Sequence, residues 1–263
     1  QLFNKDDIVL NEETSNEFIK KILKNNWKVD KLEQKPVTQK PYAPFITSTL
    51  QQEGIKQFRM SAQNIMRIAQ TLYENGYITY MRTDSVHLSN EAISASRKEI
   101  KNLYGDKYLP ATGIQYTGKV KNAQEAHEAI RPAGSTFKHP EQLKSKLDAN
   151  QLKLYTLIWK RTLASQMNPA KIQRTTLWIS DGKCIFEAKG KIILFPGFLK
   201  VYVEATENKK ARDDDEKVLP DLKQGQPLNC LSFDKKQHFT KPINRFTEAS
   251  LVKELEKLGI GRP

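Results

Sequence analysis

The stretch Gly76-Tyr77-Ile78-Thr79-Tyr80-Met81-Arg82-Thr83-Asp84-Ser85 is the segment around which the rest of the chain is organised. It places the Tyr80 hydroxyl two residues from the Arg82 guanidinium. A phenol can serve as a nucleophile, and a planar guanidinium can neutralise charge that builds on phosphoryl oxygens. The two residues are therefore candidates for attack on a phosphodiester. From these residues alone, the alternative is a tyrosine that is structural or merely exposed.

The residues before this stretch predict a helix that holds it in place. Ser61 is a suitable N-cap, and Gly76 suits the position that follows the helix C-cap. Between them, apolar residues repeat at helical spacing, at Ala62, Ile65, Met66, Ala69, Leu72 and Tyr73. We interpret this stripe as core packing that anchors the tyrosine segment, since a nucleophile has to be held to within about 0.5 Å.

Other helices are predicted on both sides of this one. Pro44 suits the first turn of a helix that precedes Phe58, and Ser89 suits the N-cap of a helix over 90–104. Two helices are expected between Pro140 and Met167, and one over 248–258. The middle of the chain is therefore predicted to be mainly helical.

A β-rich section follows residue 168. Short strands separated by Asp181-Gly182, Gly190 and Pro196-Gly197 are predicted at 175–179, 184–189, 192–195 and 201–204. Near the N-terminus, a helix and a strand-like stretch from Trp27 to Gln34 precede a proline-containing linker. The sequence thus predicts an α+β fold with a discontinuous β-rich domain, 1–40 and 169–243. A mainly helical domain, 41–168, is inserted into it, and 244–263 begins a further domain.

The amino-acid composition narrows the classes of function that fit the chain. Lysine and arginine number 43 against 30 acidic residues, which gives a net charge of +13 and favours a polyanionic partner over a merely solubilising surface. No apolar run approaches the roughly 20 residues that cross a bilayer, and the N-terminus lacks a signal-peptide pattern. Cys184 and Cys230 lack metal-ligand spacing and are interpreted as reduced thiols of a cytosolic protein.

Four segments resemble bacterial type IA DNA topoisomerases. Tyr77–Ser85 resembles their active-site segment, in which the tyrosine that matches Tyr80 becomes covalently linked to DNA. The other three follow the same order along the chain as in the family, at 43–52, 123–132 and 246–257, and the last continues to Pro263. The likeness runs from about residue 30 to the final residue. Both chain ends are accordingly interpreted as processing boundaries within a longer polypeptide.

The resemblance implies a set of site residues. Tyr80 is expected to be the nucleophile and Arg82 the residue that stabilises phosphoryl charge, with His127 near a DNA phosphate. The further residues expected to bind or position DNA are Thr79, Met81, Thr83, Asp84, Arg131 and Arg262. In the family, Mg²⁺ is held by a domain N-terminal to this region, so no metal ligand is predicted here. The acidic run Asp213–Glu216 is interpreted as a solvated loop, and His127 lacks the second histidine of a zinc helix.

The predicted function is a fragment of an ATP-independent topoisomerase. By resemblance, it cleaves one DNA strand through a 5′-phosphotyrosine, passes a strand through the break and reseals it, which relaxes negative supercoils. The β-rich domain is implied to be an arch or hinge. The partners implied are single-stranded segments of DNA and the remaining domains of the same polypeptide, in the cytoplasm with the nucleoid, and no membrane. The fragment alone is expected to bind single strands without relaxing supercoils.

Two alternatives belong to other classes. A non-catalytic single-stranded-DNA-binding module would use the basic charge only to hold phosphates. A tyrosine recombinase or a type IB enzyme would form a 3′-phosphotyrosine with several dispersed Arg and His residues. No second cluster of that kind is evident in the sequence, and the polarity of the adduct separates the classes.

Overall fold

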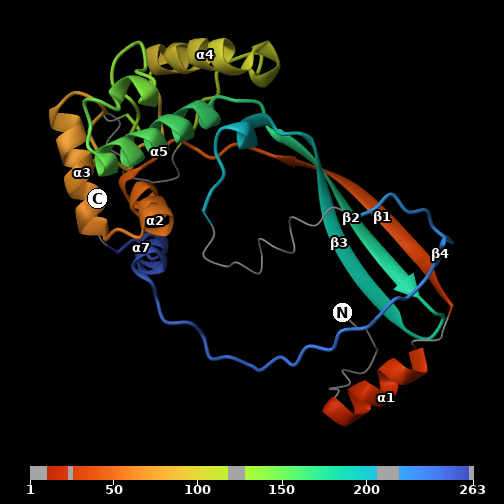
Figure 1. Cartoon of the computed structure of the whole chain (residues 1–263). Coiled ribbons are helices and arrows are strands. Elements are labelled where there is room, and N and C mark those ends of the chain that lie inside the picture. Colours follow the sequence, from red (N-terminus) through yellow and green to blue (C-terminus); the bar gives the residue numbers. More distant parts are fainter. Residues whose placement is uncertain (1–10, 23–25, 118–127, 206–218, 261–263) are drawn as a thin grey trace. The chain divides into compact units, whose positions relative to one another are not determined.

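The computed structural model describes residues 11–22, 26–117, 128–205 and 219–260, and it forms two compact units. Unit 1 comprises Gln1–Val37, Lys171–Leu194 and Asn208–Ile243, and unit 2 comprises Thr38–Ala170, Phe195–Glu207 and Asn244–Pro263. Figure 1 shows a sheet in the first and a group of helices in the second. The α+β prediction is confirmed. The division into an arch or hinge and a tyrosine-bearing domain stays a prediction.

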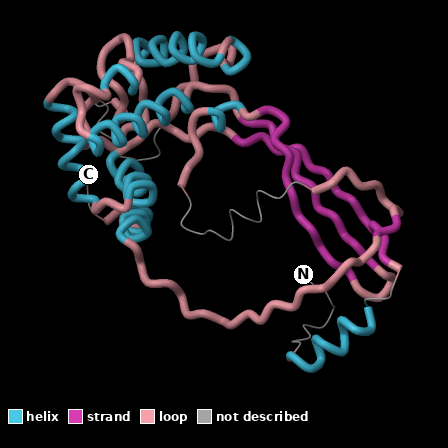
Figure 2. The backbone as a smooth tube through the Cα atoms, viewed as in Figure 1, coloured by secondary structure: helices cyan, strands magenta, loops and turns pink. Residues whose placement is uncertain are grey.

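Unit 1 is built on a four-stranded sheet in the order β3-β2-β1-β4 (Figure 2). The strands are β1 (Trp27–Gln39), β2 (Ala170–Ser180), β3 (Ile185–Phe195) and β4 (Pro227–Leu228), and helix α1 (Glu12–Ile22) precedes them. Strand β1 pairs antiparallel with β4, Trp27 opposite Leu228. The Trp27 ring is buried and meets the rings of Phe186 and Phe233 edge-on, at centroid distances of 5.3 and 5.8 Å.

The strands differ in length from those predicted. Strand β3 runs through Gly190, where a break between two short strands was expected. Strand β1 runs through Pro36, which was expected to lie in a linker. A proline lacks the N–H that hydrogen bonds between strands require. Because β4 pairs only with the start of β1, the part of β1 that contains this proline has no β4 residue beside it. The strand predicted at 201–204 is not formed. A short 3₁₀ helix, η3 (Gly197–Lys200), ends there, and Val201 keeps helical backbone angles.

Unit 2 contains the helices α2 (Thr47–Phe58), α3 (Ala62–Glu74), α4 (Asn90–Tyr104), α5 (Ala149–Ser165) and α7 (Glu248–Lys257). The 3₁₀ helices η1 (Asp106–Tyr108) and η2 (Pro140–Leu143) connect them. Two predicted N-caps are confirmed, because the Ser61 hydroxyl accepts a hydrogen bond from Asn64 N–H and that of Ser89 from Ala92 N–H. The expected first-turn position of Pro44 is wrong. Helix α2 starts only at Thr47, since the Phe45 carbonyl is engaged by Ile130 N–H.

Helix α5 forms the centre of unit 2 and contacts α2, α3 and α4. Its buried residues include Leu154, Ile158 and Leu163. Helices α2 and α3 approach closely at Gly54, where an added Cβ would lie 2.8 Å from Ile65 Cδ1. Helix α7, which was expected to begin a further domain, packs against α2 (Figure 1). Among the residues that the structure describes, no helix is long and apolar enough to cross a bilayer.

Candidate active site around Tyr80

The tyrosine segment leaves α3 through a glycine turn. Gly76 has φ +70°, the left-handed conformation that was predicted for it. Its N–H donates to the Tyr73 carbonyl and Tyr77 N–H donates to the Leu72 carbonyl, both at 2.8 Å. This pair of bonds is a Schellman motif, which satisfies the last carbonyls of the helix and fixes the direction in which the chain leaves it.

The segment 77–79 is then clamped by residues 129–133. Thr79 N–H donates to the Arg131 carbonyl (2.9 Å), and Ala133 N–H donates to the Tyr77 carbonyl (2.9 Å). The Thr79 hydroxyl accepts from Arg131 N–H (3.0 Å) and donates to the Ala129 carbonyl (2.7 Å). Both backbone and side chain of Thr79 are therefore engaged immediately before Tyr80.

A second clamp follows Tyr80 and comes from the first residue of α2. The Thr47 hydroxyl donates to the Met81 carbonyl (2.8 Å), with the Thr83 carbonyl also within reach (3.1 Å), and accepts from Thr83 N–H (2.9 Å). Thr47 N–H also donates to the Thr83 carbonyl (2.9 Å). Tyr80 thus lies between two hydrogen-bonded anchors that are far apart in the sequence.

Exposure alternates along this segment. Met81 and Thr83 are 1% and 3% exposed, whereas Tyr80 is 39% exposed and Arg82 is exposed. The Tyr80 ring meets the Tyr73 ring of α3 edge-on, with centroids 5.2 Å apart. The phenol is therefore presented to solvent from a segment whose neighbouring side chains are buried. This alternation leaves Tyr80 and Arg82 accessible on the surface, as a nucleophile and a charge-stabilising residue need to be.

The Glu128–Arg131 pair holds the partner segment. Arg131 Nη2 lies 2.6 Å from Glu128 Oε2, and Arg131 Nη1 donates to the Pro132 and Gly134 carbonyls (2.9 and 3.2 Å). Burial opposes ionisation of Glu128, but hydrogen bonds from Ser89 and Arg131 outweigh it and hold the pKa of that carboxyl below its ordinary value. Arg131 is 6% exposed. It therefore supports the backbone of the site from within.

The remaining predicted residues are Asp84, His127 and Arg262. Asp84 is half-buried after the second clamp. His127 and Arg262 lie outside the described residues, as does the acidic run Asp213–Glu216. In the part of the chain that the structure describes, no group of three or more His, Cys, Asp and Glu side chains could hold a metal ion.

Two supporting residues were missed in the sequence. Thr47 lies in one of the family-like blocks, but nothing local in the sequence shows that its hydroxyl reaches residues 81–83. Arg161 of α5 is buried, and its guanidinium lies 4.8 Å from the ring centroids of Tyr42 and Phe45. Its Nε donates to the Ala43 carbonyl (2.6 Å), which fixes the strand segment that pairs with Ile130. The sequence signal that was overlooked is an arginine, Arg161, in a predicted helix that is mainly apolar and aromatic on its buried side.

Comparisons with known proteins show which family the chain resembles. The sequence profile of the family described as DNA topoisomerase matches residues 3–263. DNA topoisomerase 1 of Mycolicibacterium smegmatis is 53% identical over 242 residues, covering 89% of this chain and 26% of the relative. DNA topoisomerase 1 of Synechocystis sp. is 47% identical over 261 residues, covering 99% and 29%. The chain thus spans between a quarter and a third of the length of these relatives.

A solved structure matches as well. The structure of full-length topoisomerase I from Thermotoga maritima has a TM-score of 0.78 and 34% sequence identity to this chain. The match covers 99% of this chain and 42% of that one.

Proposed function

The chain belongs to the bacterial type IA DNA topoisomerase family, and from this we propose that it carries the nucleophile of a strand-passing DNA topoisomerase, Tyr80. The observation that supports the proposal most is the exposed phenol held between the Thr79 and Thr47 clamps. Precise positioning of a reactive group contributes a large part of enzymatic rate acceleration. A tyrosine with a merely structural role would not need two anchors from distant segments while its own ring stays accessible.

The proposed step is a transesterification. The Tyr80 oxygen attacks the phosphorus of one phosphodiester in a single strand, and the bond from phosphorus to the 3′-oxygen breaks. The phenol proton ends on that 3′-oxygen, so the products are a 5′-phosphotyrosine and a free 3′-hydroxyl. One phosphodiester replaces another of similar energy, so resealing is the reverse reaction and needs no ATP.

Arg82 is proposed to stabilise the negative charge that develops on the phosphoryl oxygens. It follows Tyr80 by two residues and is exposed, and its guanidinium forms no ion pair with any described residue. Removing a donor of this kind typically lowers the rate by about 10²–10³-fold. Thr79 and Thr83 are proposed to position the nucleophile through the hydrogen bonds above, and Met81 through its burial.

The two units are proposed to have different roles in strand passage. Unit 2 would carry the covalently held 5′ end, and unit 1 would be the arch or hinge that lets the two DNA ends separate so that a strand can pass. Mg²⁺ is proposed to act in the full-length polypeptide, with ligands that, by resemblance to the family, lie outside this chain. The partners proposed are negatively supercoiled DNA, at single-stranded segments, and the other domains of the same polypeptide, in the cytoplasm.

A covalent-adduct assay tests the proposal. The full-length polypeptide that contains this chain is incubated with a single-stranded oligonucleotide and denatured, and the adduct is separated by electrophoresis. We expect an adduct with the native sequence and none with Tyr80→Phe, while both proteins bind the oligonucleotide equally. Equal binding without an adduct in either protein would favour the alternative of a non-catalytic single-stranded-DNA-binding module.

A further inference from the structure

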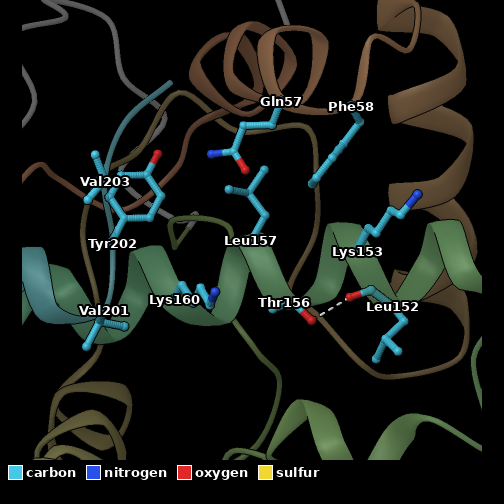
Figure 3. A pocket seen from close by; sticks show the side chains of 10 residues that line it. All are labelled: Gln57, Phe58, Leu152, Lys153, Thr156, Leu157, Lys160, Val201, Tyr202 and Val203. Carbon is cyan, nitrogen blue, oxygen red and sulfur yellow. Dashed lines mark hydrogen bonds between the residues drawn. The ribbon is translucent and has the colours of Figure 1, made fainter. Parts of the chain in front are cut away.

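A hollow lies in unit 2 at the C-terminal end of α2, and Figure 3 shows the side chains that line it. Its volume is about 340 Å³, and it is bounded by the last turn of α2, one face of α5 and residues 201–203. Thr47, which clamps the tyrosine segment, is the first residue of α2, and Phe58, which lines the hollow, is the last. At 1.5 Å per residue, about 16 Å of helix separates the two sites.

Unpaired positive charge lines this hollow. Lys153 and Lys160 are exposed on α5, and neither forms an ion pair or hydrogen bond with another residue that the structure describes. A spacing of seven residues is two helical turns, so the two lysines lie on one face, about 10 Å apart along the axis. None of the described residues that line the hollow is acidic.

The carboxylate of Glu53, close to this hollow, already has hydrogen-bond partners. Gln57 lines the hollow, and its amide donates to Glu53 Oε1 at 2.6 Å. The same oxygen accepts from Ala205 N–H (2.7 Å), and Glu53 is 2% exposed. The hollow therefore presents ammonium groups to solvent, while the Glu53 carboxylate is turned inward and the Glu204 carboxylate, beside the lining residue Val203, pairs with Arg161 at 3.4 Å. This arrangement favours an anionic ligand.

An aromatic surface completes the hollow. The Phe58 ring is half-buried, and Figure 3 shows it extending from the end of α2 toward α5. Leu157 of α5 forms an apolar floor, and the Tyr202 ring forms the opposite wall. Positive charge combined with an accessible aromatic face is typical of sites that bind single strands, because phosphates contact the cations and bases stack on the ring.

We propose that this hollow is a second binding site for single-stranded nucleic acid, in which Lys153 and Lys160 contact phosphates and Phe58 stacks on a base. The proposal rests on the proposed function for the identity of the ligand. Its volume lies in the range of small-ligand sites, about 300–1,000 Å³, and suits one nucleotide unit. The strand would continue past each lysine, so the site would lengthen the region of DNA that the chain grips beyond Tyr80.

Binding of a fluorescein-labelled oligothymidine to this 263-residue chain, measured by anisotropy at a series of salt concentrations, tests the two lysines. Each phosphate contact on a single strand contributes about 0.7 to the slope of log K against log[salt]. We expect Lys153→Ala/Lys160→Ala to reduce the slope by about 1.4. The matched control, Lys98→Ala/Lys236→Ala, removes two exposed lysines elsewhere and is expected to leave the slope unchanged. Equal reductions in both variants would overturn the proposal.

Photocrosslinking with a 5-iodouracil oligonucleotide locates the base. We expect the crosslinked peptide to contain Phe58, and Phe58→Leu to lose the crosslink and about 5-fold or more of the affinity. Phe58→Tyr keeps a stacking ring and is expected to bind normally, which controls for any loss of folding in the leucine variant. Crosslinks that map elsewhere would overturn the proposal. Tyr80→Phe is expected to leave both readouts unchanged, so failure of the covalent chemistry and failure of this site are distinguishable.

Discussion

Replacing Thr47 by valine removes one hydroxyl and keeps the shape of the side chain. The hydroxyl is a buried partner of the Met81 carbonyl and of Thr83 N–H. The Thr83 carbonyl keeps a bond from Thr47 N–H, so two buried groups lose their partner. At about 1–3 kcal/mol for each group, partly relieved by relaxation, we expect a cost of about 2–4 kcal/mol for local opening of the tyrosine segment.

Hydrogen exchange followed by mass spectrometry measures this cost on the peptide that contains Thr83. A change of 2–4 kcal/mol in local opening corresponds to exchange that is about 30- to 700-fold faster. We also expect adduct formation in the full-length polypeptide to fall by 10-fold or more, because a displacement of about 1 Å at a nucleophile costs up to 10²-fold. Thr47→Ser keeps the hydroxyl and is the matched control.

Two results would refute this reasoning. If the valine and serine variants exchanged the Thr83 amide at the same rate, the hydroxyl would not anchor the segment. If the valine variant exchanged faster but formed adduct at the native rate, the clamp would stabilise the fold without positioning Tyr80.

Three further predictions concern the surroundings of Tyr80. Tyr73→Leu is expected to lower the single-turnover cleavage rate by about 2- to 10-fold, because an edge-on aromatic pair contributes about 0.5–1.5 kcal/mol. Tyr73→Phe should retain the native rate. If the leucine variant also cleaved at the native rate, Tyr73 would have no positioning role. Gly76→Ala is expected to cost about 1–2 kcal/mol in urea unfolding because φ is +70°, and Gly76→Asn less; a neutral alanine would contradict the Schellman assignment. The pKa of Glu128 is lower in the folded chain than its ordinary value of 4.5, so its contribution to stability is present above pH 4.5 and is lost as pH falls. Glu128→Gln should therefore flatten the acid side of the stability profile, whereas the exposed control Glu141→Gln should leave it unchanged.

The features that could be predicted from the sequence are those set by neighbouring residues. Ser61, Ser89 and Gly76 act within one helical turn, so their residue types were sufficient to predict the helix ends. The features that were missed depend on distant partners. Gly190 lies within β3, which neighbours β2 in the sheet, and Pro36 remains in β1 because β4 pairs only with the start of that strand.

The same distinction holds at the site. Tyr80 and Arg82 were predicted from one short stretch and its family resemblance. The Thr47 hydroxyl reaches residues 34 and 36 positions away, and Arg161 supports the Ala43 carbonyl 118 positions away. No local pattern encodes such contacts, because they arise only when α2, α5 and the tyrosine segment pack together. Arg131, which could have contacted phosphate or supported the site, is buried, and its guanidinium bonds the nearby Glu128 carboxylate and the Pro132 and Gly134 carbonyls.

The most direct test of Tyr80 is mass spectrometry of the covalent adduct formed by the full-length polypeptide and an oligonucleotide. Trypsin cuts after Arg67 and Arg82, so one peptide, 68–82, contains Tyr73, Tyr77 and Tyr80, and fragmentation separates the three. We predict a nucleotide attached through its 5′-phosphate to Tyr80 alone. A nucleotide on another residue, or one attached through its 3′-phosphate, would contradict the assignment.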